Sequence, residues 1–346
     1  MKRTSSCLTV PNELIAQAPN DADDRSNARL MVVHRDTGEI EHKQFVDIVD
    51  YLHSGDIVIG NDVKPLPSIL RCIKNKTRAP IELSLTREID RESCTWGAYV
   101  SPSRKVRMGN RIHFDDSKLV AEVIDNTTPS ERVVSFNTKS YDELLKILYE
   151  IGYINVNGLL HRNLSREEIG FVNSIYEGDT YSVIPSISGL HFTEKIILQL
   201  QLKDVTFTTL TSRIKSPDVH RTIKNLCVST DYCNIDMRMI NDVKKTKRNA
   251  NRVCSVGLST MNALEASMNL KFGSITPICG PIETAFDRIH AISVTDILLT
   301  NFYVPYSLQF INTTFFCSEN LLTKAYNEAI KGKYNFLLYG DSLLII

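Results

Sequence analysis

The sequence has no net charge and no segment that would cross a membrane. Its 346 residues hold 40 Lys and Arg against 40 Asp and Glu, which excludes a histone-like cationic protein and an acidic disordered chain. No window approaches the ~18 consecutive apolar residues of a membrane span, and the first residues lack the apolar core of a signal peptide. With 42% hydrophobic residues and a length near two domains of ~150 residues, we expect a globular cytoplasmic protein.

Several common site signatures are also missing. None of the eight cysteines forms a C-x-x-C pair, so we expect scattered reduced thiols rather than a disulfide framework or a zinc site. The sequence contains no G-x-G-x-x-G, P-loop, H-E-x-x-H or G-x-S-x-G pattern. Dinucleotide, P-loop and zinc-protease sites and the serine-hydrolase elbow are therefore disfavoured, and no metal is expected.

Residues 81–136 have the sequence pattern of a small all-β domain. Short β-type runs separated by turn residues lie at 81–85, 95–100, 111–114, 119–124 and 132–136. This spacing is typical of an antiparallel sandwich or barrel. Residues 141–152 then form an amphipathic pattern that predicts a helix.

The flanking segments alternate strand and helix patterns. Strands are predicted at 28–35, 56–61, 253–257 and 292–302, and helices at 235–249, from 260 to 268, and after the cap residue Ser318 as far as Gly332. We therefore predict an α/β main domain of residues 1–66 and 151–346, with residues 67–150 as an inserted all-β domain.

The most pointed local feature is the segment Pro185–Thr193, which contains His191. A Pro- and Gly-rich turn followed by a helical pattern from Glu194 predicts that His191 lies at a helix start, beside free backbone N–H groups. A histidine there could bind an anion or move protons near neutral pH. A histidine that only fills a loop–helix junction explains the same pattern.

Polar side chains follow two predicted buried strands. Asn61, Asp62 and Lys64 follow the strand at 56–61, and Gly257, Ser259 and Thr260 follow the strand at 253–257. Ligands of α/β proteins bind at the carboxyl ends of strands, although solvated turns would look alike.

Two basic clusters interrupt the neutral composition. Residues 101–111 carry four bases and no acid, and residues 236–252 carry six bases and two acids. Such runs are usually solvated surface, but two of them also fit a groove that binds nucleic-acid phosphates. The residues predicted to bind RNA are Arg104, Lys105, Arg107, Lys244, Lys245, Lys247 and Arg248.

Five segments together resemble the S-adenosylmethionine:tRNA ribosyltransferase-isomerase family of queuosine biosynthesis. They are Glu13–Gln17 with Arg25 and Ala28–Leu30, Gly55–Asn61, Gly189–Thr193 (G-L-H-F-T), Thr300–Pro305 (T-N-F-Y-V-P) and Tyr339–Asp341 (Y-G-D). The resemblance runs from about residue 11 to the end in the same order. It implies a barrel-like α/β main domain with an inserted small antiparallel β-barrel.

The resemblance also implies a reaction. The ribosyl group of S-adenosylmethionine is transferred to an aminomethyl-deazaguanine at the tRNA wobble position, adenine and methionine leave, and epoxyqueuosine forms. S-adenosylmethionine would be a co-substrate, with no cofactor or metal, and tRNA the partner of a monomeric enzyme. His191 would transfer protons. The substrate-binding residues would be Arg25, Arg29, Asn61, Asp62, Lys64, Ser188, Gly189, Leu190, Phe192, Gly257, Ser259, Thr260, Thr300 and Asn301.

The chain departs from the family pattern at several polar positions. Asp62 and Lys64 replace an Asn and an Arg, Asn262 replaces an Arg, and Tyr303 replaces a His; the two His of the family's H-x-M-H-x-E stretch are missing near Leu226–Asp231, where Asp231 stands for the Glu. Lys lacks the bidentate geometry of Arg. Two further hypotheses follow: an enzyme using S-adenosylmethionine on another acceptor, or a non-catalytic RNA-binding relative.

Overall fold

A nine-stranded mixed sheet is the centre of the main domain. The computed structural model describes residues 8–19, 24–74, 80–114, 117–127, 131–156, 159–160, 162, 164, 167–214, 227–269, 273–285 and 292–346. In sheet order the strands are β18 (Ile278–Ala285), β14 (Cys227–Ile235), β13 (Thr206–Ile214), β3 (Ile57–Asn61), β15 (Val253–Val256), β19 (Ile297–Asn301), β20 (Ser342–Ile345), β1 (Arg29–Val33) and β2 (Ile40–Gln44). The central strands β13, β3, β15 and β19 run parallel, so their carboxyl ends meet at one edge.

Helices cover both faces of this sheet. The helices are α2 (Glu194–Leu202), α3 (Met237–Arg248), α4 (Leu258–Ser267), α5 (Leu308–Phe316) and α6 (Glu319–Lys331). Val58 and Leu299 pack with α2, whereas Ile57 and Leu298 pack on the opposite side, with α3 and α4 or with α5 and α6. Since side chains alternate along a strand, Gly60 and Asn301 face the α2 side.

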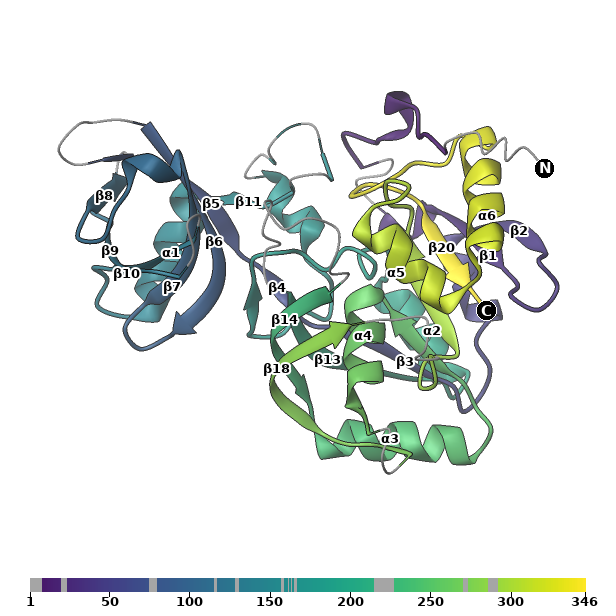
Figure 1. The fold of residues 1–346 in the computed structure, drawn as a ribbon. Coiled ribbons are helices and arrows are strands. Elements are labelled where there is room, and N and C mark those ends of the chain that lie inside the picture. The colour runs from purple at the N-terminus through teal and green to yellow at the C-terminus, as the bar shows by residue number, and fades with distance from the viewer. Residues whose placement is uncertain are drawn as a thin grey trace, which may run out of the picture.

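The inserted domain is a closed antiparallel barrel. Its strands are β5 (Pro67–Lys74), β6 (Pro80–Asp90), β7 (Thr95–Ser101), β10 (Glu131–Phe136), β9 (Val120–Asn126) and β8 (Arg111–Phe114), and pairing of β8 with β5 closes the ring. Trp96 is fully buried and stacks on Tyr141 of α1 (Tyr141–Ile151), which joins the barrel core. Figure 1 shows the barrel at one end of the molecule and α5 and α6 at the other. The predicted α/β fold with an inserted antiparallel barrel is confirmed.

Short elements complete the structure. The two-residue strands are β4 (Lys64–Pro65), β11 (Tyr153–Ile154), β12 (Tyr181–Ser182), β16 (Met268–Asn269) and β17 (Ser274–Ile275); the 3₁₀ turns are η1 (Asn12–Leu14), η2 (Arg25–Asn27), η3 (Phe45–Asp50), η4 (Ser103–Lys105) and η5 (Glu167–Val172). Among the described residues, no helix is long and apolar enough to cross a membrane.

Several predicted elements have different bounds, and two of the differences have a visible cause. The strand expected at 292–302 covers only 297–301, because the Glu265 carboxylate accepts hydrogen bonds from the backbone N–H groups of Ser293, Val294 and Thr295 and holds them as a loop. The helix expected from Ile235 begins at Met237, since the Asp236 side chain caps it by accepting from Met239 N.

Partly buried charged side chains join the barrel to the main sheet. Arg213 of β13 forms an ion pair with Asp231 of β14 at 3.0 Å and lies 3.7 Å from Glu88 of the barrel. Glu88 also accepts a hydrogen bond from the Tyr141 hydroxyl at 2.6 Å. Burial raises the pKa of Asp231, and Arg213 opposes that shift. Asp231 therefore lies at the contact between the domains.

Candidate functional site

The turn Ser188–His191 lies directly before α2. The hydroxyl of Thr193 accepts a hydrogen bond from Ile196 N and caps this helix, so its first N–H groups are not all free. His191 stands two residues before the cap. His191 therefore lies at the loop–helix junction, and at least one of the first N–H groups of α2 is taken up by the cap rather than free.

The His191 imidazole connects two distant parts of the chain. Its Nδ1 lies 3.0 Å from the carbonyl oxygen of Arg25, and its Nε2 lies 3.1 Å from that of Gly340. Burial lowers the pKa of His191, while the two carbonyls oppose the shift. A neutral imidazole donates to only one carbonyl and an imidazolium donates to both, so a proton taken up here would be stabilised by both oxygens.

A pocket opens beside this imidazole. It is lined by Pro19, Asp24, Arg25, Ala28, Phe171, Leu190, His191, Leu338 and Tyr339. Its wall is mostly apolar, with two aromatic rings and a few polar groups, which is the usual composition of a small-molecule site.

Arg25 positions one wall of the pocket. Its guanidinium donates to the carbonyls of Asn173 at 2.6 Å and Gly170 at 2.7 Å, and lies 5.9 Å from the centre of the Phe171 ring. Burial lowers the pKa of Arg25. These bonds fix the segment that carries Phe171 against the start of β1.

A second group of polar residues lies at the carboxyl ends of the parallel strands. The Asn61 amide donates to Ser212 O at 2.8 Å and to Ser259 Oγ at 3.1 Å, which ties β3 to β13 and α4. Gly257 has φ +90°, and a Cβ there would lie 3.3 Å from Ser188. A glycine therefore allows the α4 start to approach the turn.

Asp62 and Lys64 lie on the same edge but make protein contacts. Asp62 accepts hydrogen bonds from Thr211 at 2.8 Å and Thr209 at 3.4 Å, and burial raises its pKa. Lys64 pairs with Glu177 at 3.0 Å, which raises the lysine pKa.

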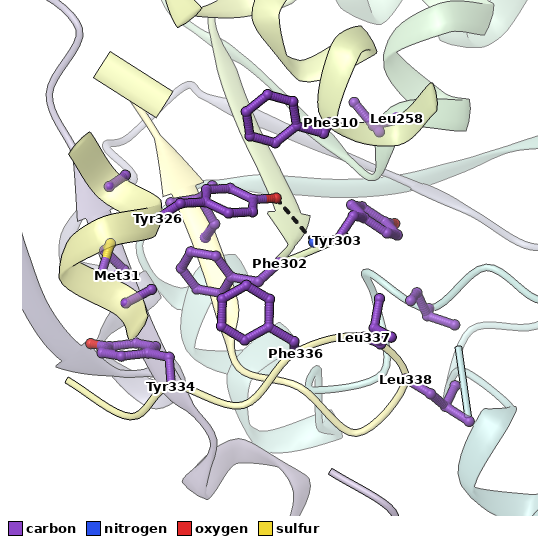
Figure 2. Packing of buried hydrophobic residues seen from close by; sticks show 14 of the residues in the cluster. Met31, Leu258, Phe302, Tyr303, Phe310, Tyr326, Tyr334, Phe336, Leu337 and Leu338 are labelled. Atoms are coloured by element: carbon purple, nitrogen blue, oxygen red, sulfur yellow. Dashed lines mark hydrogen bonds between the residues drawn. The ribbon is translucent and has the colours of Figure 1, made fainter. Parts of the chain in front are cut away.

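The T-N-F-Y segment carries unpartnered polar atoms into the core. Both amide atoms of Asn301 and the hydroxyl of its cross-strand neighbour Ser342 are buried without a hydrogen-bond partner in the described part of the chain. Figure 2 shows Tyr303 beside Tyr326, whose hydroxyl accepts from Tyr303 N at 3.0 Å. Burial raises the pKa of the Tyr303 phenol, opposed by the nearby Ser188 and Thr300. Buried polar atoms without partners are rare and mark places where a ligand could bind.

Three predicted substrate residues make contacts within the protein. Arg29 donates to Asp341 and to the carbonyls of Gly332 and Lys333. Phe192 is fully buried against Phe45 and Phe207, and the Thr260 hydroxyl donates to Val256 O at 2.8 Å. Because these side chains are engaged within the protein, they hold neighbouring segments in place rather than face a ligand.

The two basic clusters differ in how far they are neutralised. Arg104, Lys105 and Arg107 are exposed on the barrel. On α3, Lys247 forms an ion pair with Asp296 at 2.6 Å, whereas Lys245 and Arg248 are exposed and Lys244 is half-buried. Figure 1 shows α3 on the main domain, away from the barrel strands.

Some site residues were not found from the sequence. Phe171, Leu338 and Tyr339 line the pocket, Tyr176 lies against the turn, and Asp341 anchors the loop that carries Gly340. The Y-G-D motif could have signalled two of these, Tyr339 and Asp341. Leu226, in the divergent H-x-M-H-x-E stretch, lies outside the described residues. Within the residues that are described, no group of three or more His, Cys, Asp or Glu side chains could hold a metal.

Comparisons with known proteins agree along the whole chain. The family model "Queuosine biosynthesis protein" matches residues 7–345. Proteins named S-adenosylmethionine:tRNA ribosyltransferase-isomerase from Amoebophilus asiaticus and Flavobacterium psychrophilum are 37% and 34% identical, each alignment covering 100% of both chains. The crystal structure of an S-adenosylmethionine tRNA ribosyltransferase from Thermotoga maritima is similar with a TM-score of 0.52 and 26% identity, covering 97% of this chain and 98% of that one. The chain therefore belongs to the queuosine biosynthesis protein family.

Proposed function

We propose that this chain transfers and isomerises the ribosyl group of S-adenosylmethionine onto the aminomethyl-deazaguanine of tRNA, giving epoxyqueuosine. One observation carries the proposal: the turn Ser188–His191 contributes to both candidate sites. Leu190 and His191 line the apolar pocket, while Ser188 and Gly189 contact Gly257 and Tyr176 at the strand ends. Two adjoining sites suit a reaction with two substrates.

The chemistry needs proton transfer at this turn. The proton next to a sulfonium is acidic and needs a base, and the departing adenine needs an acid. We assign His191 to proton transfer, because its lowered pKa favours a neutral imidazole at pH 7 and two carbonyls stabilise its cation. One of these two carbonyl contacts must open before a substrate atom can reach a ring nitrogen.

The strand-end residues are proposed to orient S-adenosylmethionine. Asn301 has two unpartnered amide atoms, and Ser259 lies in the first turn of α4, where backbone N–H groups favour a carboxylate. Asp62 and Lys64 lie at the same edge of the sheet, where we propose that their charges influence how S-adenosylmethionine binds. Arg25 and Leu190 belong to the adjoining pocket, for which we propose the planar base of the other substrate.

The measurement that tests the function is adenine release. Purified protein is incubated with S-adenosylmethionine and tRNA carrying the aminomethyl-deazaguanine, and we expect one adenine per epoxyqueuosine formed. Adenine released only with other acceptors would support the second hypothesis, a different substrate. Salt-sensitive RNA binding without adenine release from any acceptor would support a non-catalytic protein. We also propose that the enzyme acts as a monomer in the cytoplasm, which light scattering and cell fractionation would test.

The exposed basic loop of the barrel is proposed to bind tRNA phosphates. We expect the triple variant Arg104→Ala, Lys105→Ala, Arg107→Ala to weaken tRNA binding and to reduce the slope of log K against log salt by about 2, at roughly 0.7 per lost single-strand contact. Arg111→Ala is the control, since its guanidinium is paired with Glu122 at 3.0 Å. An unchanged slope in the triple variant, measured by filter binding at several salt concentrations, would make this loop ordinary solvated surface.

On α3 we propose a smaller contribution to tRNA binding. Lys244, Lys245 and Arg248 remain candidates, whereas the charge of Lys247 is largely satisfied by Asp296. A salt bridge inside the protein reduces the counterion release that a phosphate contact would bring.

A further inference from the structure

Tyr176 lies over the carboxyl end of β3. It follows η5, and its ring is 5.1 Å from the centre of Phe207 and 6.3 Å from that of Phe192. The side chain is only partly buried. The ring is thus held by the aromatic core below α2, while the hydroxyl end points along the backbone of the strand and the turn.

Two glycines make room for this tyrosine. A Cβ on Gly189 would lie 1.6 Å from the Tyr176 hydroxyl oxygen, and a Cβ on Gly60 would lie 2.7 Å from Cε2 and 3.2 Å from the hydroxyl oxygen. Real Cβ atoms do not approach so closely, so the tyrosine position depends on both glycines. The hydroxyl is fixed between the end of β3 and the turn Ser188–His191.

The Tyr176 hydroxyl makes no hydrogen bond with another described residue, whereas the hydroxyls of Tyr326 and Tyr141 are hydrogen-bonded within the protein. Burial raises the pKa of Tyr176, and the Asp62 carboxylate raises it further. The phenol therefore stays protonated at neutral pH and is available as a donor.

We propose that the Tyr176 hydroxyl donates a hydrogen bond to an acceptor atom of bound S-adenosylmethionine. This inference rests on the proposed function and deepens it by adding a substrate-contacting residue. The small substrate is favoured over tRNA because the hydroxyl lies at the strand-end edge of the main domain. Lys64, a cation at the same edge, is already paired with Glu177, and a phosphate backbone would need unpaired cations.

The test is calorimetric binding of S-adenosylmethionine to the full chain without tRNA. We expect Tyr176→Phe to raise Kd about tenfold, the effect of one lost hydrogen bond, with an unchanged Tm and unchanged tRNA affinity. Tyr149→Phe is the matched control: its hydroxyl donates to Pro65 O, so its loss affects stability and leaves Kd as in the wild type. Wild-type Kd in Tyr176→Phe would overturn the proposal.

A second variant separates the hydroxyl from packing. Gly189→Ala displaces the tyrosine and should raise Kd at least as much, and adding Tyr176→Phe to it should cost little more, because the two changes remove the same contact. Fully additive effects would contradict the shared contact. If the wild type binds S-adenosylmethionine but forms no epoxyqueuosine, the proposed function fails while the role of Tyr176 stands; if it does not bind S-adenosylmethionine, both fail.

Discussion

His191→Ala is expected to slow adenine release by about 10² to 10⁴, the range typical of a lost general acid or base. The physical reason is the position of the imidazole, which lines the pocket and is held by the carbonyls of Arg25 and Gly340. Single-turnover kinetics with saturating S-adenosylmethionine and modified tRNA would measure the chemical step separately from substrate binding.

His191→Gln is the control that distinguishes proton transfer from positioning. The amide can donate to the same carbonyls but cannot take up a proton near neutral pH. If proton transfer is the role, His191→Gln should fold like the wild type and be as slow as His191→Ala. Restored turnover in His191→Gln would show that the histidine only ties the two chain segments together.

Burial of His191 also predicts a pH dependence of stability. Its pKa in the folded protein is lowered from the ordinary value near 6.5. Between the two values the unfolded chain binds more protons than the folded one, so stability falls as pH decreases below about 6.5 and is fully present above it. His191→Gln should remove this part of the pH dependence.

Asp341→Ala is expected to lower the free energy of unfolding by about 3 kcal/mol, because buried backbone N–H groups left without acceptors cost roughly 1–3 kcal/mol each. The Asp341 carboxylate is fully buried and accepts from Asn335 N at 2.7 Å and Arg29 N at 2.9 Å, besides the Arg29 guanidinium at 2.8 Å. Urea titration followed by circular dichroism measures the change.

Two controls bracket the role of Asp341. Asp341→Asn keeps one acceptor oxygen and should cost less. Arg29→Ala should cost less still, since the arginine side chain is 37% exposed and solvent screens its ion pair. A loss below about 1 kcal/mol in Asp341→Ala, within the range of ordinary surface substitutions, would show that the loop carrying Gly340 is held by other contacts.

Local patterns predicted part of the fold: in the main sheet they located β1, β3, β15 and β19, while β2, β13, β14, β18 and β20 had no predicted counterpart. Period-two alternation and turn residues located the barrel strands except β5, and Ser318 and Gly332 marked both ends of α6. The extended appearance of 292–296 was overridden by the carboxylate of Glu265, which captures its N–H groups from elsewhere in the chain. Such a contact between distant residues leaves no periodic signal.

The candidate site was predictable only in part. The turn with His191 was visible as a composition, and the strand-end residues followed from the rule for parallel sheets. The carbonyl partners of the His191 imidazole could not be predicted, because Gly340 lies 149 residues away in the sequence. The same holds for the contact between Arg29 and Asp341, which are 312 residues apart. Tyr176 gave no signal, since its place depends on two glycines that only the folded chain brings together.

The position of β20 makes two distant parts of the chain depend on one strand. This strand lies between β19 and β1, where it pairs with both. β1 and β2 belong to the start of the chain, yet they are connected to the rest of the sheet only through β20. Gly340, just before β20, also supplies one of the carbonyls that hold His191. A variant lacking residues from Gly340 through β20 would therefore lose the pairing that holds β1 and β2 on the sheet and one carbonyl partner of His191 at the same time.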